Sequence, residues 1–79
     1  MNIKIFAQAL TADQRRKLVK LAGTNIAYFS QISNGHRKAS SDLARELVRA
    51  SKQLFPNDDE RWLTLHGVRP DIWKQDEAA

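Results

Sequence analysis

The sequence predicts an all-α protein of about five short helices, and three observations support this prediction. Apolar residues recur at intervals of three and four along several segments, which is the spacing of one face of a helix. Residues with good capping chemistry precede these segments, and glycine or proline follows them. No segment alternates apolar and polar residues as a half-buried strand does.

The N-terminal part of the sequence predicts two helices. The pattern for the first, within residues 1–10, is weak. A capping box follows, because the Thr11 hydroxyl can accept from the backbone N–H three residues on while Gln14 reaches back to Thr11. Gly23 is expected to end the second helix, because glycine readily takes a left-handed conformation. The inner face of this second helix is expected to carry Leu18, Leu21 and Ala22.

A third, short helix is expected to begin at Asn25 or Thr24 as its N-cap and to stop at Asn34-Gly35. Phe29 and Ile32 lie three residues apart and are expected to anchor it to the core. With these two side chains buried, the outward residues are Ile26, Ala27, Ser30, Gln31 and Asn34.

Two more helices are expected in the C-terminal half. The fourth begins at Ser40 or Ser41, and Pro56 closes it because its ring and missing N–H cannot continue the helix. Its apolar stripe consists of Leu43, Leu47, Ala50 and Leu54. The acidic stretch 57–60 is expected to cap a fifth helix, which ends at Gly67. That helix is expected to contain Trp62, Leu63 and Leu65.

The charges of the chain are unevenly distributed. Residues 1–52 carry ten Lys or Arg and three acids, a net charge of +7. Residues 53–79 carry three bases and six acids, a net charge of −3. A basic first part with an acidic second part suggests a surface that binds a polyanion, although a solvated helical surface would give the same pattern.

Several classes of function have little support. The chain has no cysteine, so it has no disulfide framework, thiolate nucleophile or zinc cluster, and His36 and His66 are too isolated to predict a metal site. Phosphate-binding glycine loops and nucleophile motifs are missing, so we expect no enzyme, no cofactor and no small-molecule ligand. Residues 1–10 are too short and too weakly apolar for a signal peptide, and no apolar run reaches membrane-spanning length. We therefore expect a soluble, cytoplasmic protein without membrane contacts.

Residues 15–34 meet the requirements of a helix-turn-helix, in which two short helices are joined by a turn of three or four residues that contains glycine. Gly23 supplies the residue that tolerates a positive φ. Apolar residues just before the turn, together with Phe29 and Ile32 after it, provide the inward anchors that fix the angle between the two helices.

The run Gly-Thr-Asn-Ile-Ala-Tyr-Phe-Ser-Gln-Ile-Ser-Asn-Gly at residues 23–35 resembles the recognition segment of the Cro/repressor-like (XRE-type) family of bacterial and phage regulators. Residues 36–51 and the pentapeptide Arg69-Pro-Asp-Ile-Trp73 are similar to the YdaS-like group of that family. The chain departs from the family in two places. Val19 stands where alanine is usual, and the segment 52–68 that precedes the pentapeptide is longer than expected.

The resemblance implies a Cro/repressor-like DNA-binding domain whose third helix lies in the major groove of double-stranded DNA. Gln31 would then contact adenine through two hydrogen bonds, Ser30 would donate or accept, and Ile26 or Ala27 would meet a thymine methyl group. Phosphate contacts are expected from Arg15, Arg16, Asn25, Tyr28, Asn34, His36, Arg37 and Lys38.

Some of these roles have structural alternatives. Tyr28 can pack at the edge of the domain, and Ile26 can be partly buried. Arg45 and Arg49 provide a possible second phosphate contact, but a solvated face that pairs with Glu46 or Asp42 is the simpler interpretation.

The apolar residues after Pro56 exceed what a small helical core easily absorbs, so they are expected to form a homodimer interface; covering the base of the domain is the alternative. These residues are Trp62, Leu63, Leu65, Ile72 and Trp73. The predicted organisation is a DNA-binding domain at 1–55, a dimerisation region at 56–74 and a disordered tail at 75–79. Pairing would place two half-sites about 34 Å apart on the DNA.

The expected function is that of a homodimeric, sequence-specific transcriptional regulator, which represses by occupying an inverted-repeat operator; its own gene is one candidate target. One alternative is the DNA-binding antitoxin of a toxin–antitoxin pair, a label often attached to YdaS-like proteins. Another is a protein-interaction module that keeps the fold without binding DNA.

Overall fold

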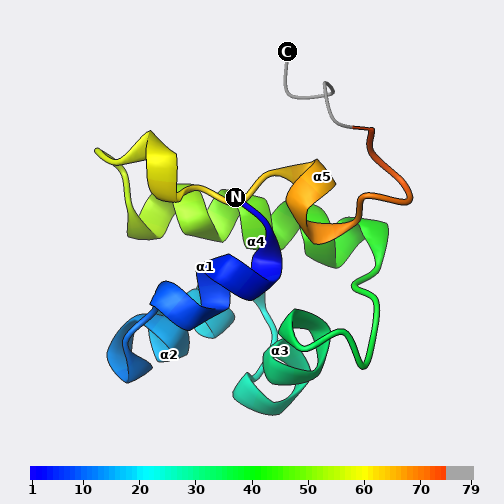
Figure 1. Cartoon of the computed structure of the whole chain (residues 1–79). Helices are drawn as coiled ribbons and strands as arrows, with labels where there is room; N and C mark the ends of the chain where they lie inside the picture. Colours follow the sequence, from blue (N-terminus) through cyan, green and yellow to red (C-terminus); the bar gives the residue numbers. More distant parts are fainter. Residues whose placement is uncertain (75–79) are drawn as a thin grey trace.

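The computed structural model describes residues 1–74, and within them the chain is helical with no strand, which confirms the all-α prediction. The elements are α1 (Ile3–Ala9), α2 (Ala12–Ala22), α3 (Ile26–Ser33), α4 (Ser41–Leu54), the 3-10 turn η1 (Asp59–Arg61) and α5 (Leu65–Val68). Helix α4 crosses the molecule, with α2 and α3 on one side and η1 and α5 on the other (Figure 1). The tail predicted to be disordered, residues 75–79, lies outside the described residues.

Each α-helix begins at a polar side chain that accepts a hydrogen bond from a free backbone N–H of the first turn. The five capping residues are Asn2, Thr11, Asn25, Ser40 and Thr64. The predicted capping box of α2 is complete: Thr11 Oγ accepts from the Gln14 N–H at 3.1 Å, and Gln14 Oε1 accepts from the Thr11 N–H at 2.9 Å. Gly23 ends α2 with a φ of 76°, as predicted.

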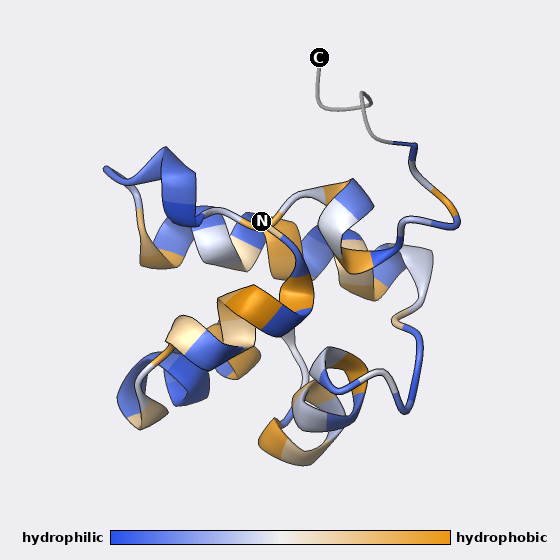
Figure 2. Cartoon of the chain, in the orientation of Figure 1, coloured by the Kyte–Doolittle hydropathy of each residue, from blue (hydrophilic) through white to orange (hydrophobic). Residues whose placement is uncertain are grey.

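A single core joins these elements. Five large side chains in it are less than 2% exposed, and each comes from a different segment of the chain: Phe6, Leu18, Phe29, Leu47 and Leu63. The Phe6 ring meets Phe55 edge-on, with 6.2 Å between the ring centroids. Figure 2 shows orange, hydrophobic stretches along α1, interrupted by blue, hydrophilic ones.

Two predicted helix faces are rotated relative to the structure. Leu21 is 42% exposed. Helix α2 packs on α4, and its buried face carries Leu18 and Ala22, which lie one turn apart, and excludes Leu21. In α4, Leu43 and Leu54 are only partly buried. The buried residues of α4 are Ala44, Leu47, Ala50 and Ser51, and three of these four are small, which lets α2 and the η1–α5 region approach the helix closely.

The predicted fifth helix around Trp62 to Leu65 is wrong. Trp62 follows the single turn of η1 with an extended backbone, and α5 begins only at Leu65. The acidic stretch 57–60 does not cap a helix either, since the N-cap Asp58 makes no side-chain hydrogen bond. The reason is tertiary: the Leu63 N–H donates to Ser51 Oγ of α4 at 3.0 Å, so it is not used within a helix.

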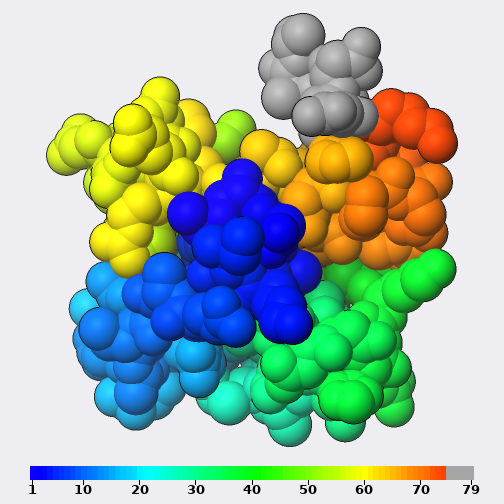
Figure 3. Space-filling view, in the orientation of Figure 1, coloured from blue at the N-terminus to red at the C-terminus, as the bar shows by residue number. Residues whose placement is uncertain are grey.

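Gly67 has a different role from the one predicted. It lies inside α5 instead of ending it, and a Cβ at this position would clash with the Met1 carbonyl oxygen. The Met1 ammonium group donates to Trp62 O at 3.3 Å. The N-terminus therefore runs between η1 and α5 (Figure 1), and the space-filling view shows it covering the centre of this face (Figure 3).

Residues 56–74 share the core with the preceding helices, because Leu63 and Val68 belong to the same buried cluster as the side chains of α1 to α4. No helix among residues 1–74 combines the length and the hydrophobicity that a membrane-spanning helix needs.

Ser51→Ala should lower the free energy of unfolding by about 1–3 kcal/mol, because the buried Leu63 N–H loses its acceptor. Urea denaturation followed by circular dichroism measures this change. The matched control is Ser33→Ala: Ser33 is also buried, but its hydroxyl donates to Ser30 O, which also accepts from the Asn34 N–H. The control should therefore cost less, and equal losses in both variants would contradict the role given to Ser51.

Candidate nucleic-acid interface

Three residues, Gly23 to Asn25, connect α2 to α3. The Gly23 N–H donates to Lys20 O at 3.3 Å and the Thr24 N–H to Val19 O at 2.9 Å, so carbonyl groups at the end of α2 are satisfied within the link. Asn25 Oδ1 then accepts from the Tyr28 N–H at 2.8 Å and caps α3. The side-chain oxygen of Asn25, predicted to lie near phosphate, is thus occupied by the helix itself.

Helix α3 is attached to the core by one face only. Phe29 is 1% exposed and Ile32 is 5% exposed, as the sequence predicted. The opposite face carries the exposed residues Ile26, Ala27, Ser30, Gln31 and Asn34. This face offers apolar groups, a hydroxyl and an amide, which are the groups that read base edges in a DNA groove.

Tyr28 packs at the edge of the domain. Its side chain is half-buried against the core, and the Arg37 guanidinium lies 5.6 Å from the centre of its ring. The structure therefore gives Tyr28 a packing role, and a phosphate contact by its hydroxyl stays a prediction.

A basic loop follows α3. The backbone N–H groups of His36 and Arg37 both donate to Gln31 O, at 2.8 and 3.3 Å, so the loop folds back onto the end of the helix. The side chains of His36, Arg37 and Lys38 are all exposed. The structure therefore places the backbone of His36 and Arg37 against the end of α3, at Gln31, and Lys38 follows them in the same loop.

The late pentapeptide holds this loop in place. Arg69 donates from Nε and Nη2 to the two carboxylate oxygens of Asp71, at 2.8 and 2.6 Å, and from Nη1 to Ala39 O. Lys38 Nζ lies 3.6 Å from the same carboxylate. The hydrogen bond from Arg69, and then the charges of Arg69 and Lys38, hold the pKa of Asp71 well below its ordinary range. Lys38 thus has an acidic neighbour that the sequence did not indicate.

The first turns of α2 carry three cations with different surroundings. Arg15 is half-buried and donates from Nη2 to Ala7 O at 2.8 Å. Arg16 and Lys17 lie 3.4 and 3.3 Å from Asp13, in exposed pairs. Exposed pairs of this kind are weak. Arg16 therefore stays available to a phosphate group, whereas Arg15 has a structural contact as well.

The whole N-terminal part is strongly basic. Asp13 is the only acid among residues 1–41, and the same residues include seven Lys or Arg. This stretch contains α1, α2, α3 and the basic loop. Such an excess of one sign favours a polyanionic partner on this side of the molecule.

The five residues predicted to form a dimer interface differ in exposure. Leu63 was wrong as an interface residue, because it is 1% exposed and belongs to the chain's own core. Trp62 and Leu65 are half-buried, and the Trp62 indole N–H donates to Phe55 O at 2.7 Å. Ile72 is 43% exposed. The aromatic residues therefore cover part of the base of the domain while leaving an apolar surface.

The cations of α4 have partners within the chain. The Arg45 guanidinium lies 5.3 Å from the centre of the half-buried Trp73 ring and 3.7 Å from Asp42. Arg49 pairs with Glu46. These contacts agree with the simpler interpretation of Arg45 and Arg49 as a solvated, paired face.

Among the described residues, no group of three or more His, Cys, Asp or Glu side chains is placed to hold a metal ion. Comparisons with protein-family models, with curated proteins and with solved structures found no match for the chain. The role of this face is therefore inferred from its exposure, its charge and its chemical groups.

Asp71→Asn should destabilise the protein at neutral pH, because Arg69 and Lys38 lose the carboxylate they contact. The lowered pKa fixes the sign: the carboxylate stabilises the fold above its ordinary pKa of 3.8, and this contribution is lost as the pH falls below that value. Urea unfolding should therefore separate the variant from the natural protein at about pH 7 and less so at about pH 3. Asp58→Asn, at a residue without a capping hydrogen bond, is the control. A difference that does not change with pH would contradict the role of this ion pair.

Proposed function

We propose that α2, the Gly23–Asn25 link and α3 form a helix-turn-helix, and that the protein is a sequence-specific DNA-binding regulator. One observation carries the proposal: α3 is anchored by Phe29 and Ile32 and turns an exposed polar face outward, within the most basic part of the chain. The glycine in the link, with its φ of 76°, is what such a turn requires.

In this proposal α3 lies in the major groove and reads base edges directly. The Gln31 amide can accept from adenine N6 and donate to N7, a pair of contacts that no other base offers in the same pattern. Ser30, one residue earlier, can donate or accept, and the exposed side chain of Ile26 or Ala27 can contact a thymine methyl group.

Phosphate contacts would flank the reading helix on two sides. Arg15 and Arg16 lie in the first half of α2, and Arg37 and Lys38 follow α3. Contacts of this kind fix the position of a protein on the duplex without distinguishing sequences. The contact of Lys38 with Asp71 limits the freedom of this side chain, so Arg37 is the better candidate for a full phosphate contact.

We further propose a homodimer that uses the surface around Trp62 and Leu65. This surface contains a cavity of about 530 Å³, which is lined by Val48, Trp62 and Leu65 and also by Lys52 and the acids Asp59 and Glu60. In a two-fold interface the same patch of each copy meets, so Lys52 of one copy can face Asp59 and Glu60 of the other. Pairing would double the length of DNA that is read. A dimer that binds its operator can repress by occupying it, and no further activity is required.

Footprinting on the DNA upstream of the gene, at several salt concentrations, tests the proposal. The expected result is salt-dependent protection of an inverted repeat, with half-sites about one helical turn apart. Failure to bind any duplex with salt dependence would overturn the proposal and would favour a protein-interaction module.

Gln31→Ala should cost about 1–3 kcal/mol of binding free energy at one base position and relax the preference there, because the amide contacts are lost. Binding to a panel of single-base operator variants measures the effect. Gln53→Ala, at an exposed position on α4, is the matched control and should bind as the natural protein does. An equal loss on specific and scrambled DNA would refute the assignment of Gln31 to base reading.

Arg37→Ala should weaken binding to all sequences alike and reduce the slope of log K against log[salt] by about one, because one phosphate contact is lost. Lys74→Ala removes an exposed cation outside the basic region and is the control. An unchanged slope for the Arg37 variant would show that this side chain does not contact phosphate.

A further inference from the structure

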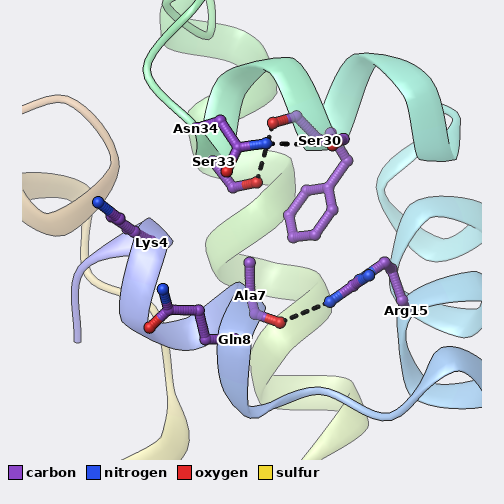
Figure 4. A pocket seen from close by; sticks show the side chains of 8 residues that line it. Lys4, Ala7, Gln8, Arg15, Ser30, Ser33 and Asn34 are labelled. Atoms are coloured by element: carbon purple, nitrogen blue, oxygen red, sulfur yellow. Dashed lines mark hydrogen bonds between the residues drawn. The ribbon is translucent and has the colours of Figure 1, made fainter.

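A small polar pocket lies where α1, α2 and α3 meet, and its volume is about 120 Å³. In Figure 4, Lys4 and Gln8 of α1 lie on one side of it, Ser30, Ser33 and Asn34 of α3 lie on the other, and Arg15 of α2 reaches in between. None of the residues that line it is acidic. The pocket therefore brings two cations and several neutral polar groups together without a compensating charge.

The Arg15 guanidinium has a donor without a partner inside this region. Its Nη2 donates to Ala7 O, whereas its Nε is buried and makes no hydrogen bond. A buried N–H without an acceptor is costly, and the cost is greater for a charged group. The pocket is lined by no carboxylate, so the charge of the Arg15 guanidinium is not neutralised by any residue around it.

The other walls also provide donors. Asn34 Nδ2 donates to Ser30 Oγ at 3.3 Å, which leaves the Ser30 hydroxyl hydrogen and the second amide hydrogen of Asn34 for a ligand. Lys4 is exposed and forms no ion pair within residues 1–74. Two positive charges with hydroxyl and amide donors match the chemistry of a phosphoryl group.

We propose that this pocket binds a phosphoryl oxyanion, and that its source is a DNA backbone phosphate next to the bases that α3 reads. The inference rests on the function proposed above and extends it, because it makes α1 a third DNA-contacting helix through Lys4 and Gln8. Ser30 and Asn34 lie on the same exposed side of α3 as Gln31, so the phosphate would lie beside the reading surface.

Lys4→Ala is the first test. It should weaken binding to specific and scrambled duplexes by the same factor and reduce the salt slope by about one, because one counterion fewer is released. Lys20→Ala is the matched control, since Lys20 is an exposed lysine of the same basic part that does not line this pocket, and it should leave the slope unchanged.

The outcomes separate the two proposals. If the natural protein binds no duplex, the proposed function fails. If it binds DNA with salt dependence and the Lys4 variant keeps the full slope, the pocket does not hold a phosphate and only this inference is overturned.

A second test uses the unmodified chain, because an Arg15 variant could unfold. The NMR resonance of the Arg15 Nε–H is followed while ¹⁵N-labelled protein is titrated with a duplex and, separately, with inorganic phosphate. A shift with the duplex at a concentration where inorganic phosphate has no effect supports a backbone phosphate. No shift with the duplex overturns the proposal; a shift with inorganic phosphate alone identifies a site for the free ion instead.

Discussion

The fold depends on the burial of one large side chain from each segment of a short chain. Phe6, Leu18, Phe29, Leu47 and Leu63 fill the core together, and each holds a different segment of the chain in place. A chain of this length buries a limited fraction of its surface, so no element can be packed on all sides. Helix α3 is the clearest case: two anchors hold one face, and its polar face is left to solvent. The surface that we propose for reading DNA is thus exposed because a chain of this length has no further element to cover it.

The C-terminal residues act on this surface from a distance. Arg69 reaches Ala39 O in the loop before α4, and its partner Asp71 contacts Lys38. These contacts fix the loop that follows α3, which would otherwise be a flexible connection beside the reading helix. They also place a carboxylate next to a cation that could contact phosphate. Under the proposed function, this arrangement would lower the affinity for DNA but give the loop a defined position. It depends on tertiary contacts, because Lys38 and Asp71 are far apart in the sequence.

Features fixed by local chemistry were predictable from the sequence. The capping box at Thr11, the positive φ of Gly23 and the anchors of α3 depend on a few neighbouring residues, and all three were predicted correctly. The failures depend on contacts between distant segments. The burial of Leu63 requires the Ser51 hydroxyl to accept its N–H, and the need for glycine at 67 arises from the Met1 carbonyl. The pocket was missed for the same reason, because its walls come from three helices and no single segment carries its pattern.

The position of α1 links the core to the proposed phosphate site. Phe6 anchors this helix in the core, and the next residue, Ala7, presents the carbonyl that accepts from Arg15 of α2. The same Arg15 side chain lines the pocket, which residues of α3 close from the other side. An oxyanion bound there would contact groups from all three helices, and a ligand that binds only the folded chain stabilises it by mass action. In the proposed complex, binding of phosphate and the orientation of α3 relative to α1 and α2 would therefore be coupled, so the backbone contact would also help to hold the reading helix at its angle.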